Sequence, residues 1–103
     1  MQNFIHDHLE EIADLCRRHH VRHLAIFGSF VRNDFDPARS DVDLLVEFAP
    51  LSPTDYAPNY FALLEALDRL FARRVDLVIA SSIKNPYFKE AVEKEQQTLY
   101  AAA

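Results

Sequence analysis

The chain has 103 residues, half of them apolar, with 16 Asp and Glu residues against 11 Lys and Arg and a formal net charge of −5. This length suits one compact domain over residues 1–103, and the acidic balance excludes a general attraction for the backbone of nucleic acids. No uncharged run approaches the roughly 18 residues of a membrane helix, no signal-peptide pattern is present, and a lone cysteine favours a reducing compartment, so we expect a cytoplasmic protein.

The first half of the chain predicts one helix and two strands. Residues 3–19 carry apolar side chains at helical spacing, with Asn3 as the N-cap. Residues 21–27 are typical of a strand that ends at the turn Gly28-Ser29, and residues 30–40 are polar and irregular. Residues 41–48 predict a second strand, which begins with alternating polar and apolar residues.

The second half predicts two more helices and one or two strands. Prolines at positions 50, 53 and 58 predict a loop, and residues 59–71 predict an amphipathic helix. Residues 75–79 are nearly all apolar and predict a strand in the centre of the sheet. Asn85-Pro86 indicates the start of a last helix that runs to about Gln97, and residues 98–100 could add a short strand. The order of elements predicts an α/β fold, a small mixed β-sheet packed by helices.

Two carboxylates at the start of the second strand are the first candidate site residues. Asp41 and Asp43 are two positions apart, so a strand places both on one face, about 6 Å from each other. Their repulsion, of order 2–3 kcal/mol at an effective dielectric constant near 20, favours a bound cation between them. Arg32 and Arg39 are the nearby cationic side chains, and a divalent ion with oxygen ligands is the alternative.

A third carboxylate and a glycine turn complete the candidate site. If the strand of Asp76 lies beside the strand of Asp41 and Asp43, the three carboxylates could hold two Mg²⁺ ions that clamp a triphosphate. Gly28-Ser29 follows a strand and can direct N–H groups and a hydroxyl at an anion, with Arg32 within reach of the phosphates. Gly28 is the only glycine, which excludes a P-loop and a dinucleotide-binding fingerprint, because each needs at least two.

These residues, in this order and spacing, resemble the motif of the minimal nucleotidyltransferases of the DNA polymerase β-like superfamily. The matching segments are Gly28-Ser29-Phe30-Val31-Arg32, Ser40-Asp41-Val42-Asp43 and Val75-Asp76-Leu77-Val78, and the resemblance covers nearly the whole chain. It implies a nucleotidyltransferase fold like the polymerase β palm. Small members of this family resemble MntA-type antitoxins, which transfer AMP from ATP to a tyrosine hydroxyl of a HEPN-domain toxin.

The resemblance also implies a role for each candidate residue. Gly28 and Ser29 would cradle the β- and γ-phosphates of ATP, with Arg32 as a further phosphate ligand. Asp41 and Asp43 would bind both Mg²⁺ ions, and Asp76 would bind the ion at the acceptor side and orient the attacking hydroxyl. Two positions depart from the family pattern, because Asn33 and Ala72 stand where glycine is usual.

Simpler interpretations exist for individual residues. Asp41 and Asp43 could be a solvated strand end, Asp76 could form an ion pair with Arg73 or Arg74, and Ser29 could cap a helix. The group of Cys16, His19, His20 and His23 could suggest zinc. However, histidines are common at helix C-termini, and Cys16 continues the apolar stripe.

We therefore expect an Mg²⁺-dependent nucleotidyltransferase that adenylylates a HEPN toxin and acts as its antitoxin. One alternative is nucleotidyl transfer to a small hydroxylated molecule, although 103 residues leave no room for a separate acceptor-binding domain. The other is a non-catalytic antitoxin that occludes its toxin by binding.

Overall fold

The computed structural model describes residues 2–28 and 41–102, which form an α/β fold. Its helices and strands are α1 (Gln2–Asp7), α2 (Leu9–Arg18), β1 (Val21–Phe27), β2 (Val42–Phe48), α3 (Pro53–Phe71), β3 (Val75–Ile79), the short 3₁₀ helix η2 (Ala80–Ser82), α4 (Pro86–Glu95) and β4 (Gln97–Ala101). Within this part of the chain, no helix has the length and apolar character needed to cross a bilayer.

The four strands form one mixed sheet in the order β3-β2-β1-β4. β1 pairs antiparallel with β2 and β4, whereas β2 and β3 run parallel. A mixed sheet packed by helices was predicted, but the central position predicted for residues 75–79 is wrong, because β3 lies at an edge. Its apolar residues serve the core mainly from one face, where Val75 and Leu77 are buried, while Asp76 between them is exposed.

Side chains of α3 cover the free edge of β3. The Tyr60 hydroxyl donates a hydrogen bond to the Leu77 carbonyl at 2.5 Å, and the Val75 N–H donates to Asp68 Oδ1 at 2.9 Å. Burial raises the pKa of the Tyr60 phenol above its ordinary value, and the negative charge of Asp76 adds to this shift. These bonds occupy backbone groups of an edge strand that could otherwise pair with another chain.

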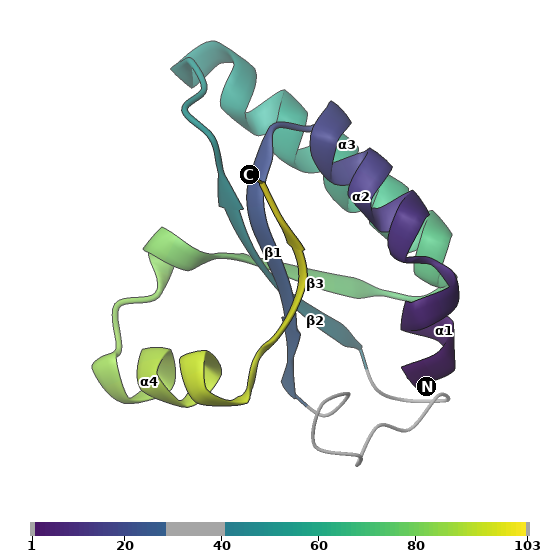
Figure 1. Cartoon of the computed structure of the whole chain (residues 1–103). Coiled ribbons are helices and arrows are strands. Elements are labelled where there is room, and N and C mark those ends of the chain that lie inside the picture. The colour runs from purple at the N-terminus through teal and green to yellow at the C-terminus, as the bar shows by residue number, and fades with distance from the viewer. Residues whose placement is uncertain (1, 29–40, 103) are drawn as a thin grey trace.

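The sheet has two unequally covered faces (Figure 1). Helices α1, α2 and α3 lie together on one face, over the main core, which includes Leu24, Leu44 and Leu63. Helix α4 lies on the other face, where Val92 packs with Phe27 and Leu45 in a smaller cluster. The face of α4 carries the candidate carboxylates, and its partial cover leaves room for a site.

The first predicted helix is divided at His8. Nδ1 of His8 donates to the Phe4 carbonyl at 2.8 Å, and the backbone N–H of His8 bonds to Ile5 three residues back, at 3.1 Å. This side-chain bond competes with the regular backbone ladder, so α1 ends at Asp7 and α2 begins at Leu9. The predicted cap at Asn3 is wrong, because α1 begins at Gln2.

The predicted proline loop is partly wrong, because α3 begins at Pro53 and contains Pro58. Ser52 is the N-cap, and its Oγ accepts the backbone N–H of Asp55 at 3.3 Å. Pro53 occupies the first turn, where a missing N–H costs little. Pro58 releases the carbonyl of Thr54, and both residues are exposed, so water can satisfy that carbonyl.

The C-terminal elements follow the prediction closely. Asn85 caps α4, with its Oδ1 accepting N–H groups of Tyr87 and Phe88 at 2.9 and 3.1 Å. The helix ends at Glu95, two residues before the predicted end, and the expected short strand is β4.

Replacing Ala72 by glycine should stabilise the fold. Ala72 ends α3 in the left-handed conformation, with φ 55° and ψ 35°, where a Cβ is unfavourable. We expect Ala72→Gly to raise the free energy of unfolding by about 1 kcal/mol, measured by urea denaturation. The matched control is Ala62→Gly at an exposed position within α3, which should lower it by a similar amount. A loss of stability in Ala72→Gly would contradict this account.

Candidate active site

Strand register brings the candidate residues into one row. Phe27 of β1 is the partner of Asp43 in β2, and Asp43 is the partner of Asp76 in β3. Directly paired residues share a face of the sheet, and neighbouring strands are about 4.8 Å apart. The carboxylates of Asp43 and Asp76 therefore lie side by side on the face that α4 only partly covers.

Gly28 follows Phe27 at the end of this row, with a φ of 76°. A Cβ at this position would collide with Oδ2 of Asp43 and lie 3.2 Å from its Cγ. Two features of position 28 therefore favour glycine: the backbone has a positive φ, and the Asp43 carboxylate approaches it closely.

Glu95 at the end of α4 reaches the same place. Its Oε1 accepts the backbone N–H of Gly28 at 2.9 Å. The position of α4 follows from Val92 in the small core and from Phe88, whose ring meets Phe27 edge-on with centroids 6.3 Å apart. Glu95 could not be identified from the sequence, because no motif distinguishes it from the other acidic residues of its helix.

These residues enclose a pocket of about 310 Å³. Its lining combines polar residues with an apolar wall, namely Phe27, Gly28, Asp43, Asp76, Val78, Phe88 and Glu95. The structure thus brings together three of the predicted site residues, Gly28, Asp43 and Asp76. Ser29 and Arg32 lie outside the described residues.

Asp41 lies just before β2 and is not part of the pocket lining. Its Oδ2 is 3.8 Å from Nε of Arg74, and the Arg74 side chain is 83% exposed. An ion pair this long and exposed contributes little free energy, so it presents no large barrier to moving Asp41 toward a cation. The buried residues Val42, Leu44 and Val46 point to the opposite face of β2. A role for Asp41 beside Asp43 stays a prediction.

The donor set of the pocket fits Mg²⁺. Within residues 2–28 and 41–102, no three His, Cys, Asp or Glu side chains come close enough to hold a metal ion alone. Mg²⁺ seldom needs such a cage, because it usually binds one or two carboxylates and completes its shell with water and substrate phosphates. Asp43 and Asp76 supply two adjacent carboxylates of this kind.

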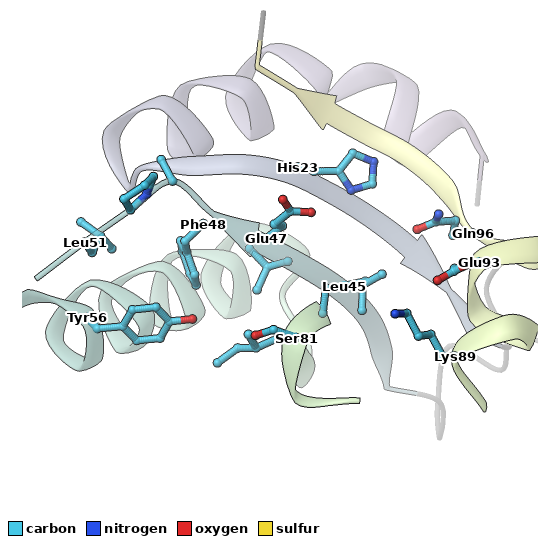
Figure 2. A pocket seen from close by; sticks show the side chains of 15 residues that line it. His23, Leu45, Glu47, Phe48, Leu51, Tyr56, Ser81, Lys89, Glu93 and Gln96 are labelled. Atoms are coloured by element: carbon cyan, nitrogen blue, oxygen red, sulfur yellow. The ribbon is translucent and has the colours of Figure 1, made fainter. Parts of the chain in front are cut away.

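A second, larger groove lies along the same face of the sheet (Figure 2). Its volume is about 1030 Å³, and its lining includes Leu45, two positions after Asp43 in β2. Side chains around it come from different elements, with Tyr56 from α3, Ser81 from η2 and Lys89 from α4. The groove is a mixed apolar and charged surface on the sheet face that also carries the carboxylates.

Cys16, His19, His20 and His23 all lie in the described part of the chain. No three metal-binding side chains come together there, so these four do not form a metal site. Cys16 is fully buried in the main core. The side chain of His19 bonds to the Leu15 carbonyl at 2.7 Å, and that of His23 bonds to Thr98 Oγ1 at 3.1 Å. These residues serve packing and local hydrogen bonding.

The family model described as "Nucleotidyltransferase domain" matches residues 9–99. "Putative protein adenylyltransferase MJ0128" of Methanocaldococcus jannaschii is 40% identical over 95 residues, covering 84% of this chain and 93% of that relative. "Protein adenylyltransferase MntA" of Thermococcus cleftensis is 34% identical over 94 residues, covering 84% and 91%.

Solved structures agree with this family. One described as "Structure of putative minimal nucleotidyltransferase" has a TM-score of 0.74 and 30% identity, with 89% of each chain covered. A tri-AMPylated Shewanella oneidensis HEPN toxin in complex with its MNT antitoxin gives 0.63 and 21%, with 99% of this chain and 74% of that chain covered, a likeness of fold alone.

The family model and the named relatives together define the class of protein as a nucleotidyltransferase. The chain belongs to the nucleotidyltransferase domain family, and its relatives place it among the minimal nucleotidyltransferases. The family and the fold inferred from the sequence motif are confirmed.

Replacing Gly28 by alanine should impair activity far more than stability. The new Cβ would push the flexible Asp43 carboxylate aside, and the positive φ would cost about 1 kcal/mol of folding free energy. We expect at least a hundredfold loss of nucleotidyl transfer, about 2.7 kcal/mol in the barrier. Ala62→Gly, with a comparable stability loss far from the pocket, should retain activity. Similar activities of the two variants would refute the proposed contact.

Cys16 should make stability depend on alkaline pH. Burial raises the pKa of its thiol from 9.0 to about 12 in the folded chain, opposed in part by Arg17. The unfolded thiol loses its proton above about pH 9 while the folded thiol keeps it, so the free energy of unfolding should fall as pH rises toward 12. The slope from this group approaches 1.4 kcal/mol per pH unit. In Cys16→Ala the free energy of unfolding should fall less steeply between pH 9 and 11, by up to about 1.4 kcal/mol per pH unit. Equal slopes in the wild type and the variant would contradict this role of the Cys16 thiol.

Proposed function

We propose that this protein is an Mg²⁺-dependent adenylyltransferase that transfers AMP from ATP to a tyrosine hydroxyl of a partner HEPN toxin and thereby acts as its antitoxin. The observation that carries this proposal is the in-register pair Asp43 and Asp76, beside Gly28 in one pocket. Two adjacent carboxylates can hold a metal ion, and a glycine backbone beside them can face an anion. This arrangement suits a metal-bound triphosphate.

The phosphate-binding role falls to Gly28 and Ser29, with Arg32 as a further ligand. Gly28 allows the backbone to approach the phosphates closely, because it has no Cβ. Asp41, Asp43 and Asp76 would hold two Mg²⁺ ions, with Asp41 leaving its exposed contact to Arg74 when a cation is present. The bound ions would neutralise phosphate charge and lower the pKa of the attacking hydroxyl.

The reaction is an in-line substitution at the α-phosphorus of ATP. The tyrosine oxygen forms a new bond to phosphorus while the bond to the bridging oxygen breaks, and pyrophosphate leaves with that electron pair. The phenolic proton passes to Asp76 or to solvent. The chain contributes mainly by positioning the reactants and by fixing charges around them.

A protein acceptor is favoured over a small hydroxylated molecule by the names of the relatives. Two of them, at 40% and 34% identity, are named as protein adenylyltransferases. The likeness of fold to an MNT antitoxin seen with an AMPylated HEPN toxin supports the same class of partner. A non-catalytic antitoxin that only occludes its toxin stays as the alternative that the experiment must separate.

The test measures the intact mass of the partner toxin after incubation with this protein, ATP and Mg²⁺. We expect a gain of one or more AMP units, abolished by EDTA. Asp43→Asn should reduce the rate at least a thousandfold, about 4 kcal/mol in the barrier, because it removes a metal ligand. Ser29→Ala should reduce the rate less than Asp43→Asn does, since the Ser29 hydroxyl is one of several phosphate contacts. Asp14→Asn, the same change at an exposed site in α2, is the control.

Equal rates for the wild type and Asp43→Asn would refute the proposed role of the carboxylate. Toxin inhibition without any gain of mass, persisting in an Asp41→Ala, Asp43→Ala double variant, would show occlusion instead of catalysis.

A further inference from the structure

The backbone N–H of Gly28 already has an anionic partner in the structure. Oε1 of Glu95 accepts it at 2.9 Å, and both residues line the pocket of Asp43 and Asp76. If the proposed function is correct, on which this inference rests, the same turn meets the phosphates of ATP. The Glu95 carboxylate then lies where an incoming phosphate oxygen would be bound.

Packing and strand pairing of neighbouring residues hold the backbone of Glu95 in place. Three residues earlier, Val92 is buried against Phe27 and Leu45. Two residues later, Gln97 pairs with Ile26 at the start of β4. The backbone of Glu95 is thus held on both sides, and only its side chain can move to release Gly28.

Among the described residues, two carboxylates lie against Gly28. The Asp43 carboxylate contacts Gly28 from β2, and Glu95 bonds to it from α4. A metal-free triphosphate would face both carboxylates at short range, where like charges repel strongly. A triphosphate that carries Mg²⁺ has less net charge and brings the cation that the carboxylates attract.

We infer that Glu95 is a specificity-determining residue that occupies the anion position at Gly28 and admits only nucleotides whose phosphates carry a divalent cation. It acts in binding and takes no part in the chemical step. In the absence of nucleotide, it also satisfies the Gly28 N–H and so stabilises the turn.

The test is the binding of ATP by the full chain, measured by calorimetry in Mg²⁺ and in EDTA. Wild type should prefer Mg²⁺-bound ATP strongly. Glu95→Gln retains an acceptor for the Gly28 N–H but has no charge. We expect this variant to bind metal-free ATP about tenfold more tightly than the wild type does, a gain of ~1.4 kcal/mol. Its ratio of affinities for Mg²⁺-bound over metal-free ATP should therefore fall about tenfold. Glu95→Ala should shift the preference in the same direction, and urea denaturation will show that each variant is folded.

Glu90→Gln is the matched control, since it makes the same charge change on the same helix at an exposed residue that pairs with Lys94 and lines neither the pocket nor the groove. It should bind both forms of ATP as the wild type does. Unchanged metal-free binding in Glu95→Gln would overturn the inference, and so would weaker binding of both forms, which would show that Glu95 only supports the turn. Wild type that binds no Mg²⁺-bound ATP at all would refute the proposed function itself, and this inference with it.

Discussion

The parallel pairing of β2 with β3 is the constraint on which the site depends. It places Asp43 opposite Asp76, so two like charges are brought together by backbone hydrogen bonding and by the packing of apolar residues on the opposite face. The repulsion of these carboxylates is tolerated because one face of each strand is buried while the other faces a pocket open to water and cations. Most of the apolar burial thus lies on one face of the sheet, and the carboxylates lie on the other.

The unequal cover of the two faces follows from the lengths and positions of the helices. The three N-terminal helices seal one face with a continuous core, and α4 covers only part of the other (Figure 1). Helix α4 both supports the sheet through Val92 and brings Glu95 to Gly28. One short helix therefore contributes to the small core and to the electrostatics of the pocket.

The edge position of β3 has a structural cost that α3 offsets. Tyr60 and Asp68 bond to the backbone of β3, which protects the edge next to the Asp76 carboxylate. Burial raises the pKa of Tyr60, and the nearby negative charge of Asp76 adds to this shift. A neutral phenol is the form that can donate the hydrogen bond to the Leu77 carbonyl.

The sequence by itself determined the strands, the capped last helix and the family, because alternation, caps and the spacing of Gly28, Asp41, Asp43 and Asp76 are local signals. Only the tertiary structure decided the edge position of β3. The start of α3 at Pro53 and the break at His8 rest on short-range side-chain bonds that the hydrophobic pattern does not show. The tertiary structure also decided which carboxylates share the pocket, pairing Asp43 with Asp76 and adding Glu95, while Asp41 lies beside Arg74. Strand order and helix docking depend on contacts between residues that are distant in the sequence, which no local pattern encodes.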